Sequence, residues 1–190
     1  MTETIKKIFC FLITSICIAY IINYNPVIGN AATTDWYLGC HYPTKSIKLR
    51  YYASYNSTYT TGIQQSLNSW NGYTSVNFAI TNNSSNYIRA EYLSATGSYG
   101  VCYYSCSGNE ITSFNITLNS NRISSEATNF NHFLRSVTVH ELGHVLGLKD
   151  NPPVTNSIMR YDRDRNSMVH PSPYDVTNVS SLYGYGNGYK

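Results

Sequence analysis

Alternation of apolar and polar positions predicts strands in the first two thirds of the chain. The stretch Ser46–Ser54 alternates with a period of two and is rich in tyrosine, as expected of a strand with one buried face. Further short runs of Val, Ile, Phe and Tyr lie between clusters of Gly, Asn and Ser, which favour turns. These runs predict strands at residues 75–80, 87–93, 100–105 and 113–119.

Three segments have the apolar spacing of helices instead. The first is predicted to begin at Thr60 or Thr61 as N-cap and to end at Gly72. Its apolar residues at helical spacing are Ile63, Leu67 and Trp70. A second helix is predicted from Asn131 to Leu146, and a short last one begins at Asp175 as its N-cap. The order is strand, helix, several strands, helix, irregular segment and helix, which predicts an α+β fold.

Composition limits the fold and the partners. The chain has 190 residues, of which 42% are hydrophobic and 12% charged, so we expect one domain with a substantial core. The net charge is +3, and the basic residues are scattered singly. Nucleic acid is therefore not an expected partner, because its recognition needs a basic patch.

The N-terminal segment has the pattern of a secretory signal peptide. Lys6 and Lys7 precede an apolar run from Ile8 to Ile22, and small residues follow. We expect cleavage after Ala31, which gives a signal peptide at 1–31 and a mature chain at 32–190. An uncleaved membrane anchor is the alternative, but fifteen apolar residues fall short of a bilayer span.

Three cysteines lie outside the predicted signal peptide: Cys40, Cys102 and Cys106. In an oxidising exterior, one disulfide and one remaining thiol are expected, and the sequence leaves the pairing open. Cys102 and Cys106 could instead bind a zinc ion, but no second pair of soft ligands lies nearby in the sequence. In a further alternative, the Cys40 thiolate binds an active-site metal and masks it.

The chemistry is concentrated in the stretch HELGH, from His140 to His144. On a helix, residues four apart lie on one face, about 6 Å apart along the axis, so both imidazoles can reach a single ion. Glu141 lies beside that face, in a position to take a proton from a metal-bound water. The alternative is a surface helix with two solvated histidines.

The residues after this helix predict a third metal ligand. A catalytic zinc takes three protein ligands and keeps an open position for water. Gly147 can adopt a positive φ, end the helix and direct the chain back toward the ion. Asp150 would then be the third ligand, and the alternative for it is a solvated loop carboxylate. The next histidine, His170, is twenty residues farther on.

The run HELGHVLGLKD, followed by SIM, resembles the metzincins, a clan of zinc endopeptidases with an H-E-x-x-H-x-x-G-x-x-[HD] helix and a Met-turn. Aspartate at the third ligand position resembles the snapalysin-type secreted proteases. The C-terminal PSPYDVTNVSSLYG resembles the end of matrixin catalytic domains instead. The resemblance covers residues 46–184 and leaves the subfamily open between snapalysin-like and matrixin-like.

The resemblance implies a single metzincin-like zinc peptidase domain of the α+β class. Its parts would be a twisted, mostly parallel sheet with an antiparallel edge strand, an active-site helix, a Met-turn and a C-terminal helix. It also implies one catalytic Zn²⁺. Residues 95–130 contain no histidine, unlike the matching loop of matrixins, so we expect no structural zinc. Ca²⁺ is a further candidate ion, because Asp162 and Asp164 alternate in one loop.

Two residues beyond Asp150 gain roles from the resemblance. Met159 matches the methionine of the Met-turn, which packs beneath the zinc ligands as structural support. Tyr161 matches the tyrosine of astacin- and serralysin-type metzincins, which binds zinc and stabilises the tetrahedral intermediate. In matrixins the same position often has no catalytic role, so both interpretations of Tyr161 stay open.

The implied function is that of a secreted metalloendopeptidase, in which a zinc-bound water activated by Glu141 attacks the peptide bond. A protein or peptide substrate would bind in extended form along the edge strand, expected at Gly100–Ser105. We expect an extracellular monomer without stable membrane association after removal of the signal. The alternatives are a catalytically silent, metal-holding binding module at the cell surface and a structural domain with an accidental motif.

Overall fold

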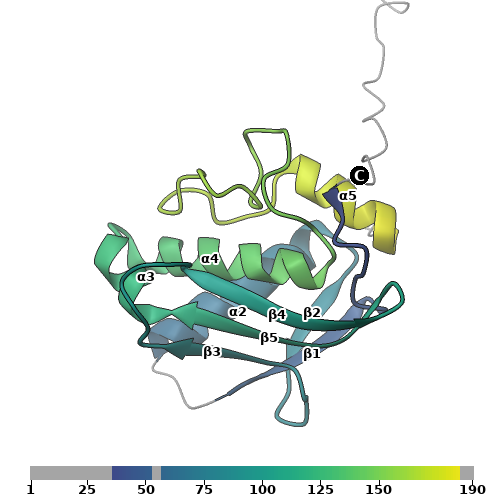
Figure 1. The fold of residues 1–190 in the computed structure, drawn as a ribbon, viewed down its shortest axis with the longest axis horizontal. Coiled ribbons are helices and arrows are strands. Elements are labelled where there is room, and N and C mark those ends of the chain that lie inside the picture. The colour runs from purple at the N-terminus through teal and green to yellow at the C-terminus, as the bar shows by residue number, and fades with distance from the viewer. Residues whose placement is uncertain (1–35, 53–56, 185–190) are drawn as a thin grey trace, which may run out of the picture. The chain divides into compact units, whose positions relative to one another are not determined.

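The computed structural model describes residues 36–52 and 57–184, and these contain a five-stranded sheet with its helices (Figure 1). The predicted signal peptide and its cleavage site lie outside the described residues. Within the described part of the chain, no helix is both long enough and apolar enough to cross a membrane.

The sheet has the strand order β2-β1-β3-β5-β4. Its strands are β1 (Ser46–Tyr51), β2 (Asn77–Ile80), β3 (Tyr87–Glu91), β4 (Gly100–Ser107) and β5 (Glu110–Asn119). All neighbours pair in parallel except β4 and β5, which are antiparallel, so β4 is an antiparallel edge strand. The predicted α+β class with a mostly parallel sheet and an antiparallel edge is confirmed.

One face of the sheet carries the core. Ile47, Leu49 and Ile88 are fully buried on β1 and β3, and Ile116, paired with Ile88, continues that row on β5. The register places Cys102 opposite Ile116 and Gly100 opposite Leu118. Gly100 and Cys102 of the edge strand therefore lie on the face that the helices cover.

Two long helices pack against each other and against this face: α2 (Ser57–Tyr73) and α4 (Phe130–Val145). Trp70 of α2 is fully buried, and its indole N–H donates to the carbonyl of Val139 on α4 at 2.9 Å. Ser66 of α2 is buried at the same contact, where its hydroxyl reaches the Arg135 carbonyl at 3.4 Å. This contact fixes α4 along the sheet, with its His140–His144 stretch near β4.

The short helices differ from the prediction. A helix at α3 (Ser120–Glu126) was not predicted; Asn119 caps it directly at the end of β5. The first helix begins at Ser57 and not after Thr60 or Thr61, and it continues through Gly72 to Tyr73. Helix α5 (Pro173–Tyr183) does not have Asp175 as its N-cap.

The correction at α5 has a clear physical cause. Ser172 is the N-cap and accepts from the Asp175 N–H, while the Asp175 carboxylate accepts from the Ser172 N–H. Asp175 thus occupies the third helical position of a capping box, which satisfies two backbone donors at once. Its other contacts are with the Ser157 hydroxyl and the Ile158 N–H. The carboxylate therefore also ties α5 to the turn at residues 157–160.

The N-terminal segment is fixed by a disulfide between Cys40 and Cys106, which leaves Cys102 as a free thiol. This confirms one disulfide and one thiol and resolves the pairing. Because both Cys40 and Cys106 are in the disulfide, neither can be a thiolate metal ligand. The same segment forms a bridge with the chain after α4, where the Leu38 N–H donates to the Gly147 carbonyl at 2.8 Å.

Candidate metal centre and active-site cleft

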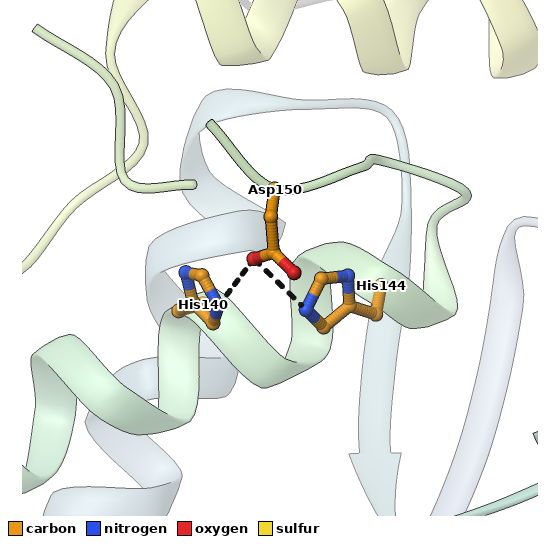
Figure 2. A group of neighbouring side chains, drawn as sticks. All are labelled: His140, His144 and Asp150. Carbon is orange, nitrogen blue, oxygen red and sulfur yellow. Dashed lines mark ion pairs between the residues drawn. The ribbon is translucent and has the colours of Figure 1, made fainter. Parts of the chain in front are cut away.

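The structure brings together three potential ligands, His140, His144 and Asp150 (Figure 2). The two histidines lie one turn apart on α4, and the Asp150 carboxylate lies between their rings. One ligand atom from each residue lies within 4.8 Å of the others. This is the only such group of three or more His, Cys, Asp or Glu side chains among the described residues.

Backbone carbonyls set the orientation of both imidazoles. Nδ1 of His140 lies 2.9 Å from the Ile158 carbonyl, and Nδ1 of His144 lies 2.8 Å from the Leu148 carbonyl. A carbonyl oxygen only accepts, so Nδ1 carries the proton in each ring. In a neutral ring Nε2 is then a bare acceptor, which is the form that binds a metal.

Both Nε2 atoms face the same carboxylate oxygen. Oδ1 of Asp150 lies 3.0 Å from Nε2 of His140 and 3.5 Å from Nε2 of His144. It is buried and has no hydrogen-bond partner. Burial, with a contribution from the charge of Arg163, lowers the pKa of His140 to about 4, so its Nε2 carries no proton at neutral pH. Two imidazole nitrogens and a carboxylate oxygen therefore face one point.

This donor set fits zinc. Nitrogen and oxygen ligands lie about 2.0–2.2 Å from zinc, so neighbouring donors of a tetrahedral site are about 3.4 Å apart. The two distances to Asp150 Oδ1 are close to that value. Three protein donors also leave a fourth position for water, as catalytic zinc sites require.

The turn after α4 places Asp150. Gly147 has a φ of +91°, as predicted, and its N–H donates to the His144 carbonyl at 2.9 Å. A Cβ at this position would also lie 2.8 Å from Cβ of His41, so the approach of the N-terminal segment requires glycine too. On the far side, the Asn151 N–H donates to the Met159 carbonyl at 2.9 Å. Asp150 thus lies between two backbone positions, Gly147 and Asn151, that hydrogen bonds hold in place.

Met159 packs beneath the histidines. It lies in a turn closed by a hydrogen bond from the Arg160 N–H to the Ser157 carbonyl, and it is almost fully buried. A Cβ added to Gly143, between the two histidines on α4, would lie 2.4 Å from Met159 Sδ. Because Gly143 has no side chain, Met159 can pack against α4 between His140 and His144. We call His140, His144 and Asp150 together the metal group.

Glu141 is buried between α4 and the edge strand. A Cβ at Gly100 of β4 would lie 2.9 Å from Cγ and Oε1 of Glu141, so the strand can approach this closely only as glycine. Burial raises the pKa of Glu141 to about 8, and the charge of Asp150 adds to the rise. A carboxyl group that titrates near neutral pH is suited to general acid and base catalysis.

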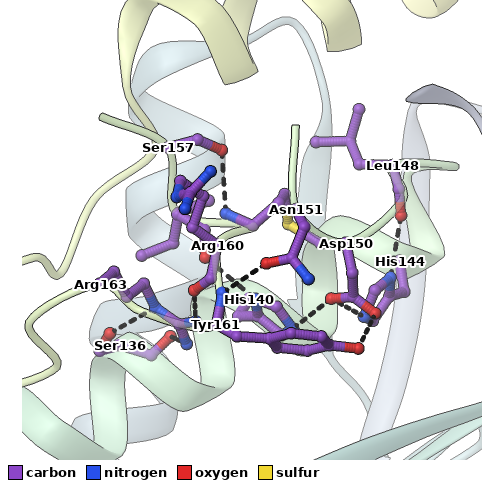
Figure 3. Close-up of polar contacts among 12 residues, drawn as sticks. Ser136, His140, His144, Leu148, Asp150, Asn151, Ser157, Arg160, Tyr161 and Arg163 are labelled. Atoms are coloured by element: carbon purple, nitrogen blue, oxygen red, sulfur yellow. Dashed lines mark hydrogen bonds and ion pairs between the residues drawn. The ribbon is translucent and has the colours of Figure 1, made fainter. Parts of the chain in front are cut away.

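Tyr161 closes the cleft on the side of Asp150 (Figure 3). Its hydroxyl donates to Oδ2 of Asp150 at 2.8 Å, and the residue is 57% exposed. Its backbone N–H donates to the side chain of Asn151 at 2.9 Å. This hydrogen bond to Asp150 raises the pKa of Tyr161, which keeps the hydroxyl protonated and able to donate.

Two adjoining pockets flank Glu141. The first, of about 290 Å³, extends over Cys102, Tyr104, His144 and Asp150, and we call it the metal-side pocket. The second, of about 350 Å³, extends over Tyr99, Arg122, Val137, Arg163 and Arg165, and we call it the arginine pocket. His140, Glu141 and Tyr161 border both. The cleft thus passes over the metal group and continues into a region with three guanidinium groups.

The sequence did not reveal this second pocket. Its arginines stand singly in two segments about forty residues apart, so no run of basic residues signals them. The pair Asp162 and Asp164, considered for Ca²⁺, gains no support. Asp162 forms an ion pair with Arg160, and the Asp164 carboxylate accepts from Ser167 and from the Asn166 N–H.

A comparison with known families gives an independent result. The model of the matrixin family matches residues 44–184, which include every strand of the sheet and all the residues named above for the two pockets. It does not distinguish the snapalysin-like from the matrixin-like subfamily. No curated protein matches the chain.

Proposed function

The chain belongs to the matrixin family, and we propose that it is a secreted zinc endopeptidase in which His140, His144 and Asp150 hold the metal. Family membership supports a metalloendopeptidase with a catalytic zinc and a protein or peptide substrate. One observation carries the assignment of ligands: the buried Asp150 oxygen faces two imidazole nitrogens and has no hydrogen-bond donor.

The chemistry divides between the metal and the protein. A zinc ion bound here would lower the pKa of a coordinated water to about 7 and polarise the scissile carbonyl. Glu141 is the general base: its carboxylate takes the proton of the attacking water and then delivers it to the leaving amine. Its raised pKa suits both transfers, because the group both accepts and releases a proton near neutral pH.

Tyr161 is proposed as a hydrogen-bond donor to the developing oxyanion. In the described structure its hydroxyl donates to Asp150, on the border of both pockets. If a metal draws the Asp150 carboxylate away, this hydroxyl becomes free to donate to substrate. Preorganised donors of this kind stabilise charge that develops in the transition state.

The substrate is proposed to bind in extended form along β4. This strand ends the sheet order and pairs only with β5, so its other edge can accept a further strand. Gly100 and Cys102 of this strand border the cleft beside Glu141. Main-chain hydrogen bonds to β4 would therefore position the scissile peptide bond next to the metal group.

Two other functions use the same residues. A catalytically silent binding module at the cell surface would hold the metal without turnover, and a structural domain would hold no metal. The buried Glu141 with its raised pKa argues for catalysis, since neither alternative needs this costly group. We also propose that residues 1–31 direct secretion and that residues 32–190 form the mature monomer.

One assay separates the three functions: release of peptides from casein, with and without a zinc chelator. For the enzyme, chelation abolishes release, and Glu141→Gln lowers kcat by about 10²- to 10⁴-fold while the zinc content stays at one per chain. Zinc without turnover in the unmodified protein would indicate the binding module. Absence of bound zinc would indicate the structural domain.

A further inference from the structure

The arginine pocket is unusually rich in positive charge. It has a volume of about 350 Å³ and lies beyond Glu141, toward the N-terminal half of α4. Arg122 comes from α3, whereas Arg163 and Arg165 come from the segment after the Met159 turn. Two separate segments thus bring three guanidinium groups to one cavity beside the reacting centre.

Tyr99 forms a shared platform for two of these groups. The guanidinium carbon of Arg122 lies 3.9 Å from the Tyr99 ring centroid, and that of Arg165 lies 4.4 Å from it. Contacts of this kind orient the guanidinium planes through the aromatic quadrupole. The Tyr99 hydroxyl in turn donates to Glu126, so the platform is itself held in place.

The positive charge exceeds the negative charge available to it. Arg122 pairs with the partly exposed Glu126 at 3.0 Å. Arg163 is buried but donates only to neutral groups, namely the Ser136 hydroxyl and carbonyl and the Arg160 carbonyl (Figure 3). Arg165 donates to the Tyr161 carbonyl, and its buried Nε has no partner. No carboxylate of the described residues forms an ion pair with Arg163 or Arg165.

A buried cation without a counter-ion is costly, and an incoming anion removes that cost. Burial, with a smaller contribution from the charge of Arg165, lowers the pKa of Arg163 to about 9, although the more distant carboxylates of Glu141, Asp150 and Asp175 act in the opposite direction. The Arg165 guanidinium borders the pocket, and its recorded hydrogen bond is to a neutral group, the Tyr161 carbonyl. A carboxylate, which can accept two parallel hydrogen bonds from a guanidinium, fits this requirement.

The direction of the substrate decides which of its residues reaches the pocket. Antiparallel pairing is the commoner arrangement, and β4 already pairs that way with β5. A peptide antiparallel to β4 passes first Tyr104 and the metal-side pocket and then Gly100 and the arginine pocket. The side chain that follows the cleaved bond therefore enters the arginine pocket.

We propose that this peptidase, given its proposed function, prefers substrates with aspartate or glutamate directly after the cleaved bond, and that Arg165 and Arg122 bind the carboxylate. Val137 and the ring of Tyr99 line the same pocket and contact the aliphatic part of that side chain. Arg163, whose hydrogen bonds are satisfied by the protein, contributes its charge. Arg165 and Arg122 are thus specificity-determining residues.

The test compares peptides that differ only in charge at this position. Peptides with blocked N- and C-termini carry Glu, Gln, Leu or Lys after the scissile bond, and mass spectrometry locates the cut. We expect kcat/KM for Glu to exceed that for Gln by about 10- to 100-fold, the worth of a hydrogen bond to a charged group. Because Glu and Gln have nearly the same shape, this comparison needs no variant of the enzyme.

Variants then assign the preference to the pocket. Arg165→Gln and Arg122→Gln should each reduce the Glu-over-Gln ratio, and Arg165→Glu should shift the preference toward Lys. Arg89→Gln is the matched control, because Arg89 also pairs with a glutamate and lies over a tyrosine ring, on β3 and outside both pockets. It should leave the ratio unchanged.

Either of two outcomes would overturn the proposal: equal rates for Glu and Gln, or a preference for Leu that Arg165→Glu does not alter. In both outcomes the peptides are still cut, and a zinc chelator still stops the cutting. Failure of the proposed function differs from both, because no peptide of the set would then be cut.

Discussion

The two pockets on either side of Glu141 have opposite electrostatic deficits. In the metal-side pocket a buried carboxylate oxygen faces two imidazole nitrogens without a cation. In the arginine pocket, Arg163 and the half-buried Arg165 have no carboxylate partner. The first region thus requires a positive charge and the second a negative one.

This difference supports the proposed roles of the two pockets, catalysis at the metal-side pocket and substrate selection at the arginine pocket. The metal group is rigidly oriented, since carbonyls of Ile158 and Leu148 fix both rings, as a catalytic centre requires. In the arginine pocket, Arg165 borders the cavity without a carboxylate partner among the described residues, as expected of a surface that binds a variable ligand. Glu141 lies between the two and is affected by both: the charge of Asp150 raises its pKa, and those of Arg163 and Arg165 lower it.

Removing the carboxylate of the metal-side pocket should have the largest effect. Asp150→Ala leaves two of three ligands, so zinc affinity should fall by more than the roughly 10- to 100-fold that loss of an outer-shell partner costs. Peptidase activity should fall with it. Asp150→His is the control, because a histidine can also ligate zinc; it should retain metal with a shifted pH–rate profile. Full zinc content and activity in Asp150→Ala would refute the ligand assignment.

The pH dependence of stability tests whether charges of the two pockets shift the pKa of Glu141 in opposite directions. In the metal-free protein its pKa of about 8 exceeds the ordinary value of 4.5, so the folded state holds a proton that the unfolded state releases. This contribution to stability is full below pH 4.5 and is lost as the pH rises through 8. The difference amounts to roughly 3–5 kcal/mol of unfolding free energy.

Urea unfolding in chelator at pH 5 to 9 measures this loss. Glu141→Gln should remove most of it, so the variant should be the more stable protein at pH 9. Arg165→Gln should move the transition to higher pH and Asp150→Asn to lower pH, because their charges act on Glu141 in opposite directions. Shifts in the same direction would contradict the comparison.

Tyr161 should act with the metal group and not with the arginine pocket. Tyr161→Phe should lower kcat by about 10²- to 10³-fold with little change in KM, as expected for the loss of one oxyanion donor. Zinc content and the Glu-over-Gln preference should stay unchanged. If kcat is near that of the unmodified enzyme, Tyr161 only shapes the pocket wall.

The smallest effect concerns the packing of Met159 against Gly143, between the two histidines. In Gly143→Ala the new methyl group meets the buried Met159, so unfolding free energy should fall by about 1–3 kcal/mol. Gly72→Ala, on α2, is the matched control: nothing lies within 4 Å of its Cβ position. There alanine should stabilise by roughly 0.5–1 kcal/mol, because it costs less entropy than glycine in a helix. Equal effects on the two variants would show that Met159 yields to the methyl group.

The features that the sequence predicted correctly depend on the spacing of residues close together in the chain. Helical periodicity placed His140 and His144 on one face, and Gly147 alone indicated the positive φ of the turn. The helix start at α5 was wrong by three residues, since Asp175 and Ser172 are both good caps and only their reciprocal hydrogen bonds decide between them. Helix α3 was missed because it follows β5 without an intervening turn.

Long-range contacts could not be predicted. The approach of Gly100 to Glu141, the pairing of Cys40 with Cys106 and the bridge of Leu38 to Gly147 join segments distant in the sequence. The convergence of Arg122 with Arg165 over Tyr99 is of the same kind. These contacts follow from the packing of the whole domain, whereas the motif residues lie within one helix and its following turn.

The central claim is that one zinc ion occupies the point between His140, His144 and Asp150. Anomalous X-ray scattering recorded on both sides of the zinc absorption edge tests it directly. We predict a single zinc peak per chain, at about 2.0–2.2 Å from Nε2 of both histidines and from a carboxylate oxygen of Asp150. A zinc-loaded protein without a peak at this point, or with a third protein ligand other than Asp150, would contradict the account.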